Sequence, residues 1–293
     1  MGKKRARTAH DILQPAVRGN MERIRAAAVR VLSNREDEEA VHDFRVGLRR
    51  LRTVLRSARS IYGKRRIKAL EAAFKRFGDA TNALRDAEVL AETLALADLD
   101  EAHRAAADRW LDDERHRQAR LRDAAMAAIE GGELEGAFAA LLDAIGEQPR
   151  EDVTIKRFAK TRLRDVQRGV GELLPVSKDD VAALHRLRIR FKRLRYTAEM
   201  LERFTSVGKP RKKEKPPQRR SSYAKIAKHA QRMQKLLGTL HDADVALNAV
   251  DVAAALGDDE RRVVKSGLRS LRARLVDESI AALEALPPWV LGQ

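Results

Sequence analysis

Apolar and polar residues follow the period of an amphipathic α-helix over most of the chain. Phe44, Leu48, Leu51 and Leu55, for example, form an apolar stripe on one helical face. Glycine, proline and short polar clusters separate the periodic segments. The pattern predicts helices over residues of about 10–32, 34–62, 65–96, 100–129, 134–145, 153–174, 177–204, 223–256 and 258–286.

One stretch occurs twice without a gap, as VHDFRVGLRRLRTVLR over 41–56 and LHRLRIRFKRLRYTAE over 184–199. Upstream, Asn34 aligns with Ser177 and Asp37 with Asp180, so each copy carries an N-cap candidate and an acid three residues later. The sequence therefore predicts a duplicated chain whose halves meet near Pro149.

Each copy places a row of basic side chains beside its apolar stripe. The spacing i, i+3, i+7, i+10 keeps four residues on one helical face over about 15 Å. The two rows are His42, Arg45, Arg49 and Arg52, continued by Arg56, and His185, Arg188, Lys192 and Arg195. Such a row is usually a solvated basic face, but its recurrence at matched positions favours an anion-binding surface.

Further basic residues follow the motif helices. The same spacing relates Lys225, Lys228, Arg232 and Lys235 in the second half. In the first half, Lys68 and Lys75 share a face of the third predicted helix. We therefore expect an anion site to which the two halves contribute unequally.

The motifs HxxRVxxRRLR and HxxRIxxKRLRY, with TNALRDAEVL at 81–90 and LGTLHDADVAL at 237–247, resemble the CHAD family, the conserved histidine α-helical domain. The resemblance implies an all-α fold of two four-helix bundles related by a pseudo-twofold axis. It also implies that the basic helices line a central channel that binds inorganic polyphosphate. The chain departs from the family pattern at Asn82, where the motif has glycine, and at His241, where it has arginine.

Two aligned carboxylates, Asp86 and Asp242, lie in the second motif of each half. Ion pairing on an exposed helix surface is one interpretation, with a contribution of at most about 1 kcal/mol per pair. The alternative, which the resemblance supports, is that they orient the motif arginines through bidentate contacts. We expect the second role.

The predicted organisation has four parts. Residues 1–9 form a basic N-terminal tail, 10–149 the first half, 150–286 the second half and 287–293 a C-terminal tail. The segment 206–222 is rich in Lys, Arg and Pro and cannot form a core, so we expect a basic loop. It is either a solvated connector or an arm that reaches for a polyanion.

Composition points to a polyanionic partner. The chain has 60 Lys and Arg against 43 Asp and Glu, a formal net charge of +17. Nucleic acid, an anionic membrane surface and a phosphate polymer all fit this charge. Aromatic residues are only 4% of the chain, which weakens the case for single-stranded nucleic acid, whose bases stack on aromatic rings.

Other features narrow the classes of function. The absence of cysteine excludes disulfides, thiolate metal ligands and a cysteine nucleophile. No apolar run is long enough to span a membrane, so we expect a cytoplasmic protein, including association with polyphosphate granules.

The sequence contains no clear set of catalytic residues. His42–Asp43 and His241–Asp242 are fragments of a metal site, but basic neighbours would repel a divalent cation. No Walker-type phosphate loop, GxSxG or HExxH motif is present. We therefore expect a polyphosphate-binding module without a cofactor; the alternatives are a nucleic-acid-binding protein and a metal-dependent phosphohydrolase.

Overall fold

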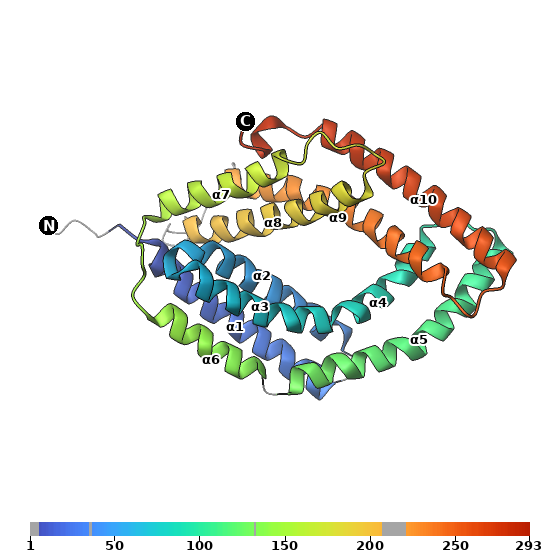
Figure 1. Cartoon of the computed structure of the whole chain (residues 1–293), viewed down its shortest axis with the longest axis horizontal. Helices are drawn as coiled ribbons and strands as arrows, with labels where there is room; N and C mark the ends of the chain where they lie inside the picture. Colours follow the sequence, from blue (N-terminus) through green and yellow to red (C-terminus); the bar gives the residue numbers. More distant parts are fainter. Residues whose placement is uncertain (1–5, 35–36, 132, 207–220) are drawn as a thin grey trace, which may run out of the picture.

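The structure, a computed structural model, describes residues 6–34, 37–131, 133–206 and 221–293. Within these ranges the chain is all-α, as predicted, apart from one isolated bridge between Thr8 and Thr154 (Figure 1). The helices are α1 (Ala9–Ser33), α2 (Glu38–Tyr62), α3 (Lys64–Ala80), α4 (Asn82–Ala95), α5 (Glu101–Glu130), α6 (Glu133–Gly146), α7 (Ile155–Gly171), α8 (Val181–Ser206), α9 (Ser222–Val250), α10 (Asp258–Glu284) and the short 3-10 helix η1 (Pro288–Val290).

The prediction of one helix over 65–96 is wrong, because α3 ends and α4 begins at Thr81. The Thr81 hydroxyl donates a hydrogen bond of 2.9 Å to the carbonyl of Gly78. A side chain that bonds the neighbouring backbone in this way competes with regular helix. Its counterpart α9 has Leu237 at the aligned position and continues without a break.

The predicted N-caps Asn34 and Ser177 are also wrong, since each motif helix begins three residues later. The carboxylate of Asp37 accepts from the amide of Ala40 at 2.8 Å, and that of Asp180 accepts from the amide of Ala183 at 2.7 Å. A carboxylate suits this position because unpaired amides and the helix dipole make a helix N-terminus positive. Both copies of the motif thus open with the same cap.

The buried residues form two cores. The first lies among α1, α2, α3 and α6 and includes Phe158 of α7 and Met200 of α8, and the second lies among α4, α8, α9 and α10. Helix α5 serves both, with Trp110 in the second core and Met126 and Ile129 in the first. Each core therefore draws on residues from both sides of Pro149, and the pseudo-twofold relation of two four-helix bundles stays a prediction.

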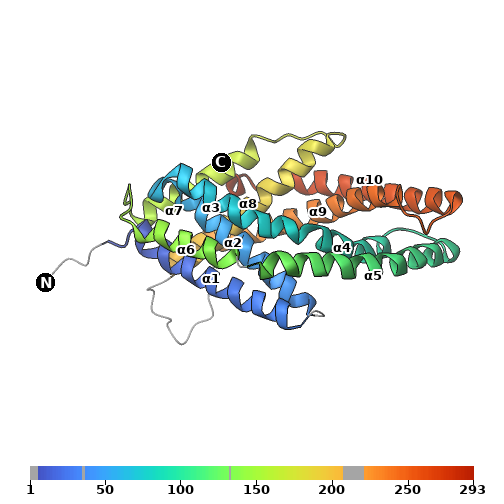
Figure 2. The ribbon, with the colours of Figure 1, turned by 60° about the horizontal axis from the view of Figure 1, so that its bottom comes forward.

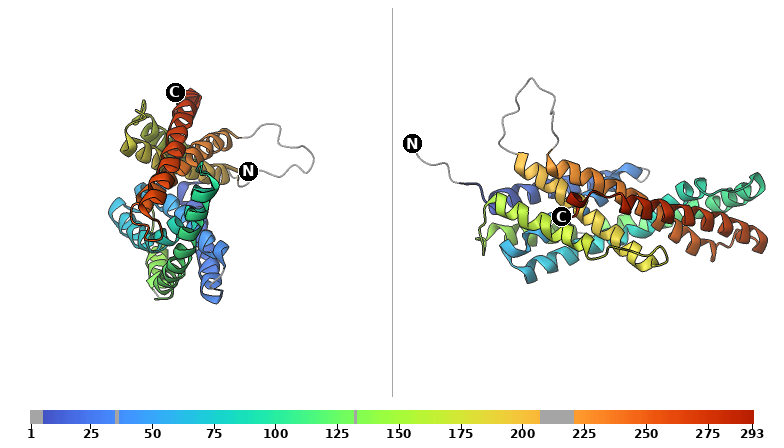
Figure 3. Two further views of the ribbon diagram at one scale, coloured as in Figure 1. Left: turned by 90° about the vertical axis from the view of Figure 1, so that its right-hand side faces the viewer. Right: turned by 90° about the horizontal axis from the view of Figure 1, so that it is seen from above.

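The molecule is elongated because two helical hairpins, α4–α5 and α9–α10, extend side by side to the same end (Figures 2 and 3). Arg109 of α5 forms an ion pair with Glu260 of α10. Gly267 of α10 lies against the turn after α4, where a Cβ atom at this position would stand 2.9 Å from the carbonyl oxygen of Asp98. The close approach explains why this position has no side chain.

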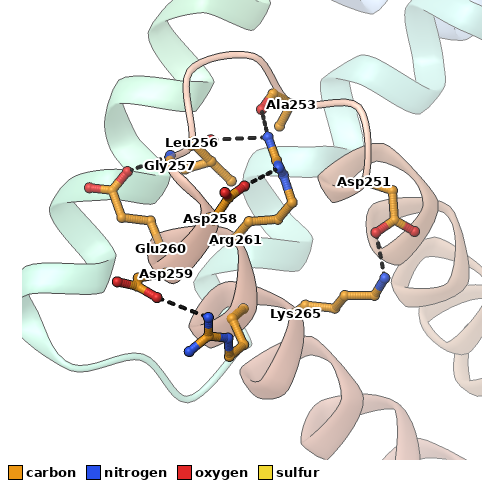
Figure 4. Close-up of polar contacts among 10 residues, drawn as sticks. Asp251, Ala253, Leu256, Gly257, Asp258, Asp259, Glu260, Arg261 and Lys265 are labelled. Atoms are coloured by element: carbon orange, nitrogen blue, oxygen red, sulfur yellow. Dashed lines mark hydrogen bonds and ion pairs between the residues drawn. The ribbon is translucent and has the colours of Figure 1, made fainter.

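The turn between α9 and α10 is fixed by one arginine (Figure 4). The Arg261 guanidinium donates to the carbonyls of Ala253 and Leu256 at 2.9 and 3.0 Å and forms a 3.1 Å ion pair with Asp258. Lys265 adds an ion pair to Asp251. These contacts pair two carbonyl groups of the turn that follows α9 and hold the turn against the start of α10.

The C-terminal residues 287–293 pack on the protein rather than extending from it. Val290 is fully buried, and the Gln167 side chain of α7 donates to its carbonyl at 3.0 Å. Most of the predicted N-terminal tail and of the predicted loop 206–222 lies outside the described residues. No helix in the described part of the chain is both long and apolar enough to span a membrane.

Candidate anion-binding site

The two motif helices contact each other and line a basic cavity. Helices α2 and α8 bury their apolar stripes in the two cores, with Phe44 and Phe191 fully buried. The neighbouring faces line a cavity of about 160 Å³. Its basic lining residues are Arg49, Arg52, Arg56, Lys192 and Arg193.

A second basic cavity, of about 220 Å³, lies between α2, α7 and α8. It shares Arg56 and Arg193 with the first. Its further basic residues are Arg59, Arg162 and Arg190, and Asp165 is its acid. Shared lining residues make the two cavities neighbours, so cationic side chains follow one another along the contact of α2 and α8.

Electrostatics indicates that this site is short of negative charge. Burial lowers the pKa of Lys192 to about 7. The positive charges of four nearby arginines, Arg49, Arg188, Arg45 and Arg52, add to this shift. Burial likewise lowers the pKa of Arg45 and of Arg56 to about 10 each. Desolvation and like charges both disfavour the charged form of a basic group. The gathered cations would be stabilised by an anion placed among them.

Several guanidinium groups here also lack hydrogen-bond acceptors. The Nε atoms of Arg49, Arg52 and Arg188 are buried, and none has an acceptor among the described residues. Buried polar groups are nearly always paired, so orphan donors in a native site indicate a ligand or other bound group. We call Arg45, Arg49, Arg52, Arg56, Arg188, Lys192 and Arg193 the α2–α8 basic site.

Arg45 is held by the break between α3 and α4. Its guanidinium donates to the Thr81 hydroxyl at 2.6 Å and to the side-chain oxygen of Asn82 at 3.1 Å. Asn82, the departure from the family motif, thus contributes an acceptor that glycine lacks. These contacts explain how a side chain beside like charges keeps a fixed position.

The expected bidentate contacts from Asp86 and Asp242 to the motif arginines are absent among the hydrogen bonds of the described residues. Both carboxylates act on Arg188 through charge alone, and burial raises the pKa of Asp242. The bidentate acid is Glu71 of α3, which accepts from Arg59 at 2.5 and 2.6 Å. Glu71 is 6% exposed and its carboxylate also lies 3.8 Å from Arg56, so it offsets part of the positive charge of the α2 row.

The two motif histidines differ in their surroundings. His42 is exposed at the start of α2. His185 is partly buried, and its Nδ1 atom lies 3.3 Å from Nδ1 of His241. Burial lowers the pKa of His241 to about 4, and the nearby Arg188, His185 and Lys192 add to this shift. The second departure from the family motif therefore places a neutral imidazole against His185.

The remaining predicted residues lie at the periphery. Arg195 donates to Glu199 at 2.7 Å, and Lys75 forms an ion pair with Asp79. Neither lines the two basic cavities. The same holds for five exposed residues on α3 and α9, namely Lys68, Lys225, Lys228, Arg232 and Lys235.

Sequence reasoning missed Arg59, Arg162, Arg190 and Arg193. Arg59 continues the α2 row one turn beyond Arg56, and that spacing was a usable signal. Arg190 and Arg193 flank the α8 row, and only the packing of α7 and α2 brings them to a cavity. Within the described residues, no three His, Asp or Glu side chains are grouped so as to hold a metal ion.

Comparisons with known proteins agree with this architecture. The family profile of the CHAD domain matches residues 15–251. Among solved structures, the CHAD domain from the plant Ricinus communis is 21% identical, with a TM-score of 0.69 over 98% of this chain and 95% of that one. PptA from Streptomyces chartreusis is 16% identical, with a TM-score of 0.62 over 95% of this chain and 98% of its own. The TM-scores show that the chain shares the fold of both structures. No curated protein sequence matches the chain.

Proposed function

This chain belongs to the CHAD domain family, and from that membership and the α2–α8 basic site we propose that it binds inorganic polyphosphate. Family membership supports a polyphosphate-related role in general. The observation that carries the specific proposal is the group of buried guanidinium Nε atoms without protein acceptors, at Arg49, Arg52 and Arg188. Phosphate oxygens are strong acceptors for such donors.

A phosphate polymer fits the repeated character of the site. From Arg45 to Arg56 the α2 row extends about 16 Å along the helix axis, since each residue rises by roughly 1.5 Å. A chain of linked phosphates would offer acceptors and negative charge along that whole length. Each new contact on a bound chain forms at high effective concentration, which raises affinity without any new kind of contact.

The contribution of each basic residue to polyphosphate binding would depend on its position. Arg49, Arg52 and Arg56 of α2 face Lys192 and Arg193 of α8 and would bind phosphate oxygens directly. The exposed lysines of α3 and α9 would contribute long-range attraction, which raises the rate of association and weakens with salt. His42 and His185 stay candidates for hydrogen bonds to phosphates at the N-terminal end of each row.

We propose binding without turnover. Phosphoryl transfer needs a nucleophile or metal ion beside the cationic groups. The nearest histidine pair, His185 and His241, lies beside Arg188 and Lys192, whose charges disfavour a divalent cation. A binding protein of this kind would associate with polyphosphate granules, as the sequence led us to expect.

A competition experiment tests the proposal. A fluorescent long-chain polyphosphate is bound to the full-length protein at fixed salt and displaced with unlabelled polyphosphate, RNA or orthophosphate. The proposal predicts displacement by unlabelled polyphosphate at a much lower phosphate concentration than by RNA. Equal displacement by RNA would contradict it, because charge alone would then explain binding, and would favour the nucleic-acid alternative.

The enzyme alternative has its own test. Purified protein is incubated with polyphosphate, with and without magnesium or manganese, and chain length is analysed over time. The proposal predicts unchanged chain length in all samples. Shortening that requires the metal and is lost in Lys192→Met would establish a phosphohydrolase instead.

A further inference from the structure

A third cavity, of about 330 Å³, lies between α1, α2 and α8, outside the α2–α8 basic site. We call it the α1–α8 cavity. Unlike the two basic cavities, it has a largely apolar wall, formed by Ile12, Pro15, Ala16, Val54, Met200 and Phe204. Its volume is in the range of small-molecule sites, which are typically apolar with a few well-placed polar groups.

Four arginines line the cavity, namely Arg7 and one each from α1, α2 and α8. Arg23 of α1, Arg50 of α2 and Arg203 of α8 all line the cavity, and none forms an ion pair or hydrogen bond with a described residue. Burial lowers the pKa of Arg203, and the nearby charges of Arg50 and Arg23 lower it further. The cavity therefore concentrates positive charge next to apolar surface.

The acids of the cavity are already engaged elsewhere. Asp11 accepts a hydrogen bond of 2.9 Å from the amide of Thr8, as part of the cap of α1. Glu199 accepts from Arg195 at 2.7 Å. The charge of Glu199 acts on Arg203 as well, but the cavity is lined by four arginines and only these two carboxylates, so a net positive charge remains for an anion.

Two buried polar atoms point to a ligand independently of the charge. Asn20 is 5% exposed, and its amide nitrogen donates to the carbonyl of Ala16 at 2.7 Å. Its oxygen is buried without a donor, and Nε of Arg50 is buried without an acceptor, among the described residues. The wall thus presents one unmet acceptor and one unmet donor, an arrangement that costs stability unless a bound group completes it.

We propose that the α1–α8 cavity binds a small organic anion with an apolar body, of the class of aliphatic or aryl carboxylates and sulfonates. The acidic head would accept from Arg50 and Arg203, and the body would cover Ile12, Met200 and Phe204. A hydroxyl or N–H group on the body would donate to Asn20. Inorganic phosphates fit this cavity poorly because they have no apolar surface to bury against its wall.

The cavity adjoins the α2–α8 basic site, since Thr53 and Tyr196 line both. A test must therefore separate the two. The probe is 8-anilinonaphthalene-1-sulfonate, which combines an acidic head, an aromatic body and one N–H donor and fluoresces when its body is shielded from water. Decanoate and tripolyphosphate serve as competitors on the full-length protein.

We expect saturable one-site binding of the probe and displacement by decanoate but not by tripolyphosphate at equal concentration. Arg50→Gln with Arg203→Gln should weaken probe binding about tenfold or more, because two charge-assisted contacts are lost. Ala16→Phe, which fills the cavity and keeps every charge, should weaken it as strongly. Arg117→Gln with Arg120→Gln, on the exposed face of α5, is the matched control and should change it less than about twofold.

Polyphosphate affinity of each variant shows that the fold is intact and should stay close to that of the parent protein. Equal displacement by tripolyphosphate and decanoate would overturn the proposal, because the apolar wall would then have no role. So would a control pair that weakens the probe as much as the cavity pair. Both results leave the polyphosphate proposal standing, so the two proposals fail separately.

Discussion

The two copies of the motif present similar cations in different surroundings. In the first copy, Arg45 donates to Thr81 and Asn82 at the break between α3 and α4. In the second, α9 is unbroken and has Leu237 and Gly238 at the aligned positions, and Nε of Arg188 has no acceptor among the described residues. The motif sets the position of each arginine along its helix, and the companion helix determines whether the protein itself holds the guanidinium.

The next position of the row differs as well. Arg49 of α2 aligns with Lys192 of α8, whose pKa burial and neighbouring arginines lower to about 7. An arginine stays charged in such surroundings, whereas a lysine can release its proton. The first copy is thus a permanently charged row with one fixed arginine, and the second is the copy whose charge responds to pH and ligand.

The largest expected effect comes from reversing one cation in each copy. Arg45→Glu with Arg188→Glu should lower polyphosphate affinity by about 100-fold or more, because each charged hydrogen bond contributes roughly 1.5–3 kcal/mol. Arg117→Glu with Arg120→Glu on α5 gives the same change in net charge at exposed positions and should lower affinity by less than about threefold. Fluorescence titration measures both. Similar losses from the two pairs would mean that net charge, not the arrangement of the rows, attracts the polymer.

The hydroxyl that holds Arg45 is tested by stability. Thr81→Val should lower the free energy of unfolding by roughly 1.5–3 kcal/mol, because Thr81 is fully buried and its hydroxyl bonds both Arg45 and the backbone. Urea denaturation followed by circular dichroism measures the change. Thr81→Ser keeps the hydroxyl and should cost less than about 1 kcal/mol. Equal losses in both variants would assign the effect to packing and remove the proposed difference between the copies.

The pH response of Lys192 distinguishes the second copy from the first. A bound polyanion favours the charged amine, so polyphosphate affinity should be highest below the free-protein pKa of about 7 and fall as pH rises through it. Between pH 6 and pH 8 the expected loss is about tenfold, and in Lys192→Arg it should be much smaller. Calorimetric titration at several pH values measures the two profiles. Parallel profiles for parent and variant would show that another group is responsible.

Stability should respond to pH in the opposite direction. The unfolded lysine keeps its proton up to its ordinary pKa of about 10.4, whereas folded Lys192 releases it near pH 7. The unfolded chain therefore binds more protons between these values, and the Lys192 contribution to the free energy of unfolding rises with pH. Denaturation of the parent and of Lys192→Arg across this range gives an independent check of the same shift.

The smallest effect concerns the acceptor that the second copy lacks. A Cβ atom at Gly238 would meet nothing within 4 Å, so Gly238→Asn should fit and stabilise α9 by a few tenths of a kcal/mol. An asparagine at the position that matches Asn82 should also compete with polyphosphate for Arg188 and lower affinity about twofold. Gly238→Ala is the control for helix propensity. Identical affinities for the Asn and Ala variants would show that the new side chain does not reach Arg188.

Much of the fold and of the central row followed from the sequence, because helical periodicity determines which side chains share a face. The all-α architecture and the places of Arg49, Arg52, Arg56 and Lys192 are of this kind. The face that a helix turns inward depends on its neighbours, and periodicity alone does not give it. The row Lys225–Lys235 on α9 has the same spacing as the motif rows, yet its four basic residues are exposed outside both basic cavities.

Contacts between distant elements were the other limit. We expected Asp86 and Asp242 to accept bidentate hydrogen bonds from motif arginines, but the carboxylate that accepts such a pair, from Arg59, is Glu71 on α3. The choice depends on the rotation of α3 against α2, which two aligned motifs do not encode. The contact of His185 with His241 and the place of Arg190 in the second basic cavity also depend on how helices pack, so the sequence did not predict them.

The most direct test of an extended two-row site uses chain length as its variable. Orthophosphate, tripolyphosphate and a long polyphosphate are titrated calorimetrically at two salt concentrations. Our account predicts that affinity rises steeply with chain length and then levels off, because a long chain contacts both rows and phosphates beyond them meet no further ordered cations. We also expect the steepest salt dependence for the longest chain, because the protein neutralises the largest number of phosphates on it. Equal affinity per bound phosphate and equal salt slopes for all three ligands would contradict an extended site and indicate a single small phosphate pocket.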